Sequence, residues 1–326
     1  MKTALLAPLV VGIGCGTFQD PNVVVDLRVL AMTATPPEQI VDVDLRNPAP
    51  AIDLFDQLVA TDVCALVADP NFTRRLRWSM VACNLDGAER CPADGRPQIK
   101  LGEGLLDDPE VTRPEPPLCV TVPANGNLFG LLVGILGGDT LHGLGGIDYG
   151  VSLRIGGENA DPELDLYAAK TVQVAPRIPM GRTANTNPRL DGVFATVDGG
   201  LSGPIALGRC ADQTTPLEVA PGQKIRLMPL EPDGVREVYV TPAIDGTSRT
   251  FTEALTYQWI AAAGSFSSGD TGGPHDPFGN PAPLFSNWTA PAAADLTGPT
   301  AVPIWIVQRD ERFGAQWYET CVLVVP

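Results

Sequence analysis

The sequence predicts an all-β protein built from two β-sandwich domains in tandem. Two observations carry the prediction: short segments with strand-like alternation recur along the chain, and glycine and proline interrupt them throughout. Gly and Pro number 34 and 32 in a chain of 326 residues, about a fifth of the whole against an average of about 12%. Such frequent interruption favours short strands over long helices. The length fits two domains.

The first fourteen residues are typical of a secretory signal. Lys2 supplies one positive charge, and an apolar run and small residues follow it. The run is too short to cross a hydrocarbon core of ~30 Å, and Pro8 interrupts it. Residues 1–14 are therefore expected to be a signal peptide that is removed.

The sequence Gly12-Ile13-Gly14-Cys15 resembles the cleavage box of bacterial lipoproteins, in which the cysteine receives the lipid. The family usually has Leu where Gly12 stands, and an unlipidated secreted form is the alternative. The resemblance implies a lipid on Cys15 and a lipidated tether over residues 15–22. Gly16 rather than Asp after the cysteine implies the outer membrane, at its periplasmic face or at the cell surface. Several acyl chains, at about 0.8 kcal/mol per buried methylene, make such an anchor permanent.

Six further cysteines are expected to form disulfides. An even number suits an oxidising compartment. The sequence has no Cys-x-x-Cys pair, and its two histidines lie far from the cysteine clusters, so a metal site is disfavoured. Of fifteen connectivities, we expect three pairs: Cys83 with Cys91 across a polar loop, Cys64 with Cys119 in the first domain, and Cys210 with Cys321 in the second.

The first sandwich is expected over residues 23–176. Val25, Leu27, Val29 and Ala31 alternate with polar residues, which indicates a half-buried strand over 23–34. Further β-rich runs cover residues 56–69, 75–83, 117–123, 149–155 and 166–175. Six strands at this spacing favour a sandwich.

Residues 127–146 are an exception because they are apolar and rich in glycine. They predict a short helix or an ordered loop that closes one end of the domain. Asp139 and His142 interrupt the stretch too early for a membrane span. Two roles stay open: a buried plug, or a patch that binds a partner or touches a membrane.

A Pro- and Asn-rich segment, residues 177–190, is expected to link this domain to a second sandwich over 191–326. The sequence leaves open whether the domains dock rigidly or swing about the linker. Strand-like runs in the second half cover residues 190–198, 223–230, 237–243, 254–266, 286–291, 301–310 and 317–325.

The two halves also align loosely with each other. Trp78 lies mid-strand in the first half, and Trp259 takes the equivalent place in the second. Residues 118–124 then match 287–291, residues 151–158 match 305–311, and residues 167–175 match 317–325. The pattern predicts a diverged tandem duplication.

Four features of the second half resemble immunoglobulin-like modules of bacterial surface proteins, including the PKD-like kind. They are Tyr257 with Trp259, the sequence GSF at 264–266, the sequence WTAP at 288–291, and a strand that ends Arg309-Asp310. The family's glycine-rich turn is replaced here by ERFG at 311–314. The resemblance implies two immunoglobulin-like sandwiches behind a lipoprotein signal peptide. It leaves function open, because the architecture serves adhesins, spacers, enzyme appendages and assembly subunits alike.

The net charge of −16 argues against a nucleic-acid-binding surface, because phosphate affinity needs clustered Lys and Arg. Solubility explains the acidity. The sequence GDTGGP at 269–274 is one substitution from the serine-protease box GDSGGP, but Thr271 replaces the nucleophile. His142, the only upstream histidine, lacks that family's surroundings. We therefore expect a glycine loop here.

Other candidate ligands are sparse. His275 and Asp276, with Asp270 nearby, are far short of a metal or acid–base set. Asp191 and Asp198 fit a hairpin turn as well as a calcium site. We predict no catalytic residue, no metal and no cofactor. An enzyme, the rival from another class, needs Asp270, His275 and Asp276 to face a cleft.

The tryptophans are mostly expected in the core, and Trp288 and Trp317 are the better candidates for a surface that binds a sugar or a protein. The sequence therefore predicts a non-enzymatic binding, spacer or assembly module of the bacterial cell envelope. Its partners are expected to be a membrane, through the lipid, and an unknown envelope protein or glycan. The alternative is a glycan or protein receptor that uses the 266–288 loop.

Overall fold

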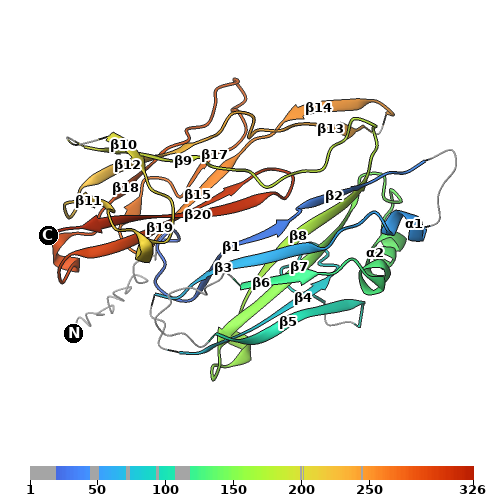
Figure 1. Cartoon of the computed structure of the whole chain (residues 1–326), viewed down its shortest axis with the longest axis horizontal. Coiled ribbons are helices and arrows are strands. Elements are labelled where there is room, and N and C mark those ends of the chain that lie inside the picture. The colour runs from blue at the N-terminus through green and yellow to red at the C-terminus, as the bar shows by residue number, and fades with distance from the viewer. Residues whose placement is uncertain are drawn as a thin grey trace, which may run out of the picture.

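The computed structural model describes residues 20–44, 51–70, 74–92, 95–106, 118–198, 200, 202–243 and 245–326. The expected signal peptide and the expected lipid site, Cys15, lie outside these residues. The described part is all-β, as the sequence predicts, and forms two sandwiches that lie against each other (Figure 1). Over these residues, no helix has both the length and the apolar character needed to cross a membrane.

The first sandwich packs a three-stranded sheet against a five-stranded one. The smaller sheet has the order β1 (Arg28–Thr35), β3 (Thr61–Ala68), β6 (Leu118–Val122). The larger sheet has the order β2 (Glu38–Val41), β8 (Leu166–Pro176), β7 (Ile147–Gly157), β4 (Leu76–Cys83), β5 (Gln98–Leu106). The helices α1 (Ala51–Phe55) and α2 (Gly126–Gly138) lie together at one end, and a 3-10 turn, η1 (Pro162–Leu164), precedes β8.

The second sandwich packs two five-stranded sheets. One has the order β10 (Ser202–Ile205), β9 (Gly192–Val197), β12 (Lys224–Leu230), β18 (Ser286–Thr289), β16 (Ser265–Phe266). The other has the order β11 (Leu217–Val219), β20 (Ala315–Val324), β19 (Thr300–Arg309), β15 (Thr256–Ala261), β17 (Asp270–Gly272). A hairpin of β13 (Val238–Pro242) and β14 (Ser248–Thr252) and two 3-10 turns, η2 (Cys210–Asp212) and η3 (Ala293–Asp295), complete it.

The two sandwiches share one strand order. Strands β2-β8-β7-β4-β5 correspond to β11-β20-β19-β15-β17, and the edge strand is parallel to its neighbour in both sheets. Strands β1-β3-β6 likewise correspond to β9-β12-β18. The segments that align in the sequence fall on these equivalent strands: β4 with β15, β6 with β18, β7 with β19, and β8 with β20. The fold therefore repeats as the sequence alignment predicts, in the order typical of immunoglobulin-like sandwiches.

Three disulfides join the cysteine pairs expected from the sequence. Cys64 and Cys119 face each other across β3 and β6, Cys83 at the end of β4 bonds Cys91 in the next loop, and Cys210 in η2 bonds Cys321 in β20. The last bridge closes a separation of 111 residues, and the loop bridge closes only 8. Each disulfide joins residues of the same sandwich.

Each sandwich has its own apolar core. Met80, Tyr149 and Leu153 are fully buried in the first, and Trp259 and Trp288 in the second. Burying such side chains is the main favourable term in folding, at about 1.5–3 kcal/mol each for aliphatic and phenyl groups.

A third apolar cluster lies between the two sandwiches. Leu30 and Ala31 of β1 and Leu66 of β3 pack against Ile260 of β15 and Trp305 of β19, and all are almost fully buried. The outer face of the small sheet of the first sandwich is therefore covered by a sheet of the second. The two domains are docked and do not swing freely about the segment between them.

The expected strand over residues 23–34 is shorter than predicted and begins at Arg28. Its first residues pair with the second sandwich instead: the amide of Val24 donates to Ala261 O at 2.9 Å, and the amide of Ala261 donates to Asn22 O at 2.9 Å. The segment is extended, as its alternation predicts, but it is not half-buried: Val25 is 39% exposed, and residues 30–34 are all buried because β1 lies between the first core and the second sandwich. The sequence does not show that the partner of Val24 is 237 residues away.

A buried polar cluster reinforces the interface between the domains. The carboxylate of Glu38 in β2 accepts from Arg182 at 2.9 Å, from Arg312 at 2.5 Å and from the amide of Asn185 at 2.8 Å. Arg182 and Asn185 belong to the segment between the sandwiches and are themselves buried. This segment is therefore part of the packed interface. A buried carboxylate is tolerated because it is paired and hydrogen-bonded.

Candidate functional site

Helix α2 forms in spite of its composition. Five of its thirteen residues are glycine, each of which disfavours a helix by about 1 kcal/mol relative to alanine. Asn125 caps its first turn by accepting from the amides of Asn127 and Leu128. Leu128, Leu131 and Leu132 then bury one face against the first core. Tertiary packing therefore stabilises this helix more than intrinsic propensity does.

The chain turns back after α2 and brings more apolar side chains over the same end of the domain. His142 and Gly143 adopt left-handed backbone conformations, with φ of 51° and 80°. The carboxylate of Asp139 accepts from the amide of Gly143 at 2.6 Å, which fixes the turn. A side chain at Gly143 would meet Leu136 at 2.9 Å. Glycine is favoured here by its φ, whereas the contact is with the end of a flexible side chain that can shift.

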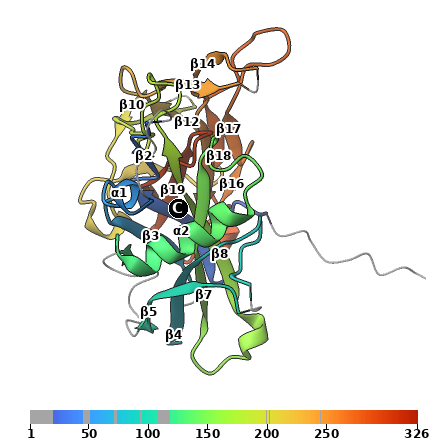
Figure 2. The same cartoon turned by 90° about the vertical axis from the view of Figure 1, so that its right-hand side faces the viewer.

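Helix α1 lies beside α2 and contacts it through aromatic rings. The centroids of Phe55 and Phe129 are 5.2 Å apart, and the rings meet edge to face at 64°. Phe55 and Leu58 are buried in the first core. The two helices thereby cover the end of the sandwich, as Figure 2 shows from that side.

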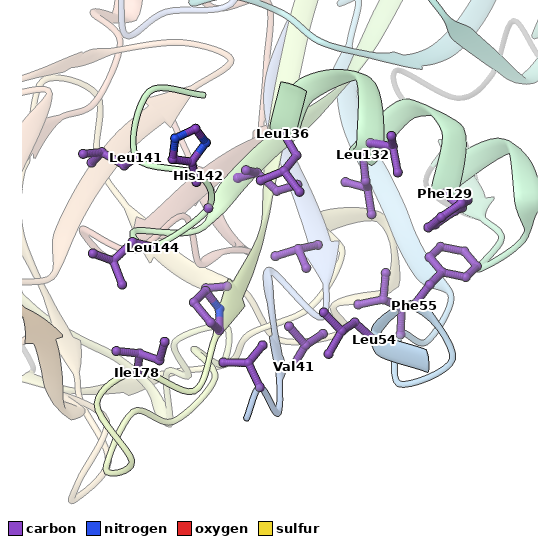
Figure 3. Close-up of a pocket in the computed structure, with 18 residues that line it drawn as sticks. Val41, Leu54, Phe55, Phe129, Leu132, Leu136, Leu141, His142, Leu144 and Ile178 are labelled. Atoms are coloured by element: carbon purple, nitrogen blue, oxygen red, sulfur yellow. The ribbon is translucent and has the colours of Figure 1, made fainter. Parts of the chain in front are cut away.

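An open apolar pocket of about 460 Å³ lies between these elements. Its walls are α1, α2 and the turn after α2, and its floor is the adjoining ends of β2, β7 and β8. Figure 3 shows the labelled side chains surrounding an open centre. The eighteen lining residues are Val41, Val43, Leu54, Phe55, Leu58, Phe129, Leu132, Val133, Leu136, Leu141, His142, Gly143, Leu144, Ile147, Val174, Ala175, Pro176 and Ile178. The volume lies within the range of small-molecule sites.

The rim of the pocket exposes large aliphatic side chains to solvent. Val133, Leu136, Leu141 and Leu144 are exposed by 46%, 39%, 58% and 43%. A cluster of exposed aliphatic residues around a concave site is typical of an interaction surface. In the glycine-rich stretch, Leu128, Leu131 and Leu132 are buried against the core, as a plug requires, while these four side chains are exposed beside the pocket.

Charged groups border the pocket without lining it. Arg177, between the lining residues Pro176 and Ile178, pairs with Asp42, which lies between Val41 and Val43. Asp148 follows Ile147 and accepts from Gln173 at 3.0 Å. Burial is the main reason that the pKa of Asp148 is raised, and the charge of Glu38 adds to the effect.

The expected candidates His275 and Asp276 do not form a site. Both side chains are exposed to solvent. The carboxylate of Asp276 accepts from the amides of Phe278 and Asn280 and from the side chain of Asn280, each at 2.8 Å, and these bonds lower its pKa. Its role is to shape a loop.

The protease-like sequence at 269–274 has a structural role. The hydroxyl of Thr271 accepts from the indole of Trp259 at 2.8 Å and donates to Leu284 O at 3.1 Å, inside the second core. Asp270 is exposed on the edge strand β17. Because Asp270, His275 and Asp276 all stand in solvent, they do not provide the desolvated cleft that catalysis needs.

The prediction that Trp288 is a surface residue is wrong. Its side chain is fully buried, and its indole donates to Ala263 O at 3.1 Å. Alternation along β18 turns Ser286 and Trp288 toward the core and Asn287 and Thr289 away from it. Trp317 is half-buried against the cluster between the sandwiches.

A second cavity, about 320 Å³, lies at the interface of the two sandwiches and includes Lys170 and Asp310. Burial lowers the pKa of Lys170 to about 8, against the opposing effect of Asp310. The ammonium donates to Phe313 O in the other sandwich. Lys170 thus already has a partner that holds the domains together. Across the described ranges, no group of three or more His, Cys, Asp or Glu side chains is placed to hold a metal ion.

Sequence reasoning missed half of the pocket. It singled out residues 127–146 but not α1, Val41 or Ile178, which come from segments far away in the chain. One signal was present: in AIDLFDQL, Leu54 and Leu58 are four residues apart, as on one helical face.

Comparisons with known proteins identify no family. No family model matches the chain, and no curated protein matches it. Among solved structures, one match is the native conformation of E. coli alpha-2-macroglobulin, determined by cryo-EM. It is 11% identical with a TM-score of 0.22, and the match covers 94% of this chain but 17% of that one. A likeness at this level supports no argument about function, so the site must be interpreted from its own geometry.

Proposed function

We propose that this chain is an exported, non-enzymatic binding module of the bacterial cell envelope, and that the apolar pocket between α1 and α2 is its binding site. The pocket carries the proposal, because it combines a ligand-sized volume with exposed aliphatic side chains at its rim. The three disulfides support an oxidising compartment outside the cytoplasm.

Attachment to the outer membrane through a lipid on Cys15 belongs to the same proposal and rests on the lipoprotein-like sequence at 12–15. Intact mass spectrometry of the protein extracted from membranes tests it. We expect loss of residues 1–14 and an added acyl mass on Cys15. An unmodified cysteine, or a chain that keeps the leader, would contradict the anchor.

The geometry favours this pocket over the 266–288 loop as a receptor site. A receptor at that segment is expected to use an exposed Trp288, and Trp288 is buried; Phe278 of the same segment is 90% exposed but does not line the apolar pocket. A plain spacer has no need of an apolar pocket, and leaving one open to water is unfavourable.

An uncharged fluorescent probe, N-phenyl-1-naphthylamine, tests the pocket directly. We expect saturable binding of one probe per chain, with enhanced and blue-shifted emission. Leu136→Glu combined with Leu144→Glu should abolish the binding, since both side chains line the pocket. Leu164→Glu is the matched control, because Leu164 is 75% exposed in η1 and lies outside the pocket. Equal binding by both variants, with unchanged melting temperatures, would refute the site.

A further inference from the structure

The chemistry of the pocket wall is almost uniform. Of the eighteen lining residues, His142 alone has an ionisable side chain, and all the others are aliphatic, phenylalanine, proline or glycine. A peptide or a sugar carries polar groups that lose their hydration on binding and need hydrogen-bonding partners. Hydrocarbon needs none. The wall therefore complements a purely apolar ligand group.

The pocket also has two unlike ends. Figure 3 shows Phe55 and Phe129 at one end and Leu141, His142 and Leu144 near the other. Phe55 is buried and Phe129 half-buried, whereas the residues of the turn at the other end are exposed. Two aromatic rings therefore pack at one end, and exposed aliphatic side chains lie beside an imidazole at the other. Such polarity fits an amphiphile, with its tail against the rings and its head group at the turn.

The charges near the pocket determine which head-group charge is favoured. Asp42 and Asp139 lie within two residues of the lining side chains Val41 and Leu141. The nearby cations are already paired: Arg177 with Asp42, and Arg182, which also donates to Gly145 O at 3.2 Å, with Glu38. The chain as a whole carries a net charge of −16. The local and overall fields therefore oppose an anionic head group, and they oppose approach to an anionic bilayer.

We propose that the pocket takes the linear alkyl chain of a single amphiphile whose head group is uncharged or cationic, acquired as a monomer and not from an anionic bilayer. This inference rests on the proposed function and specifies its ligand. The alkyl tail lies among α1, α2 and the ends of β7 and β8, and the head group stays in solvent beside His142.

A series of synthetic amphiphiles tests the proposal below their critical micelle concentrations. Octyl, decyl and dodecyl maltosides vary the tail, and dodecyl trimethylammonium and dodecyl sulfate vary the head charge. By isothermal titration, we expect Kd to fall about fourfold for each added methylene until the tail fills the pocket. We expect the sulfate to bind more weakly than the maltoside at low salt, and the difference to shrink as salt rises.

The variants used for the naphthylamine probe serve here as well. Leu136→Glu with Leu144→Glu should remove binding of every maltoside, and Leu164→Glu should preserve it. Chain-length-independent affinity, or tighter binding of the sulfate than of the maltoside, would overturn the proposal. The proposal would also be overturned if the protein floated with anionic phosphatidylglycerol vesicles and the double variant did not.

The two experiments distinguish an error in the binding site from an error in the ligand class. If the naphthylamine binds in the pocket but no alkyl chain does, the ligand class is wrong and the binding site stands. If neither binds to the folded protein, both the site and its ligand are wrong.

Discussion

Arg312 of the second sandwich forms a buried ion pair with Glu38 of the first. Its guanidinium lies 2.5 Å from Glu38, 3.4 Å from Glu253 and 3.5 Å from Glu237, and its side chain is only 12% exposed. The carboxylates of Glu38 and Glu253 are buried almost completely, with 2% and 1% exposure. Replacing Arg312 by methionine keeps much of the packing but removes one ion pair from each of these carboxylates, so that Glu38 keeps Arg182 while Glu253 loses its contact with Arg312.

Removing one partner of a buried ion pair costs about 3–5 kcal/mol, and we expect Arg312→Met to lower the free energy of unfolding by that amount at about pH 8. Urea unfolding followed by tryptophan fluorescence measures it. Arg75→Met is the control, because Arg75 and Glu158 form an exposed pair whose side chains are 49% and 30% exposed. Such a pair contributes about 0–1 kcal/mol.

A double-mutant cycle with Glu38→Gln separates the coupling of the pair from the loss of packing. We expect a coupling energy above about 1 kcal/mol, because Glu38 and Arg312 are in direct contact. If Arg312→Met costs no more than Arg75→Met, the polar cluster does not stabilise the docking and our reasoning about it fails.

Three further predictions concern stability and one concerns proteolysis. Burial, with the charge of Asp310, raises the pKa of Glu253 to about 7 from 4.5. The folded state therefore holds that proton more tightly than the unfolded state, and the free energy of unfolding should fall as pH rises from about 4.5 to about 7. Glu253→Gln should flatten this pH dependence in urea unfolding experiments. Replacing the Cys210–Cys321 disulfide, which spans 111 residues, by serines should lower the free energy of unfolding by about 4.8 kcal/mol, against about 2.5 kcal/mol for Cys83–Cys91, which spans 8. Equal losses in denaturation experiments would contradict the loop-entropy argument. Trp288→Ala should cost about 3–5 kcal/mol in the same assay, whereas a surface tryptophan would cost little. Trypsin should fail to cut the native protein at Arg182, which is buried, and rapid cleavage there would contradict the docked arrangement.

The repeat and the disulfide pairing were predictable because their signals are local. Each strand carries its own alternation and each turn its own glycine or proline, so segments around Trp78 and Trp259 align without knowledge of the fold. For the cysteines, the short polar loop between Cys83 and Cys91 predicted one bridge, and keeping the other pairs within one domain then left the pairing that the structure has.

The interface and the pocket were not predictable because their partners are distant in the chain. Glu38 meets Arg182 across 144 residues and Arg312 across 274. Trp288 is buried because it shares the inner face of β18 with Ser286, and a strand of four residues is too short for its own alternation to show which face is the inner one. The pocket combines three separate segments, and the sequence marks only the glycine-rich one.

The apolar cluster between the sandwiches has a consequence for modularity. Immunoglobulin-like domains can be arranged in tandem as independent units, so that each is soluble alone and copies can be added or deleted. Here Leu30 and Leu66 of the first sandwich are buried against Ile260 and Trp305 of the second. Cutting between the halves would expose that surface to water. The two copies of the fold therefore make one body, and we expect them to unfold together.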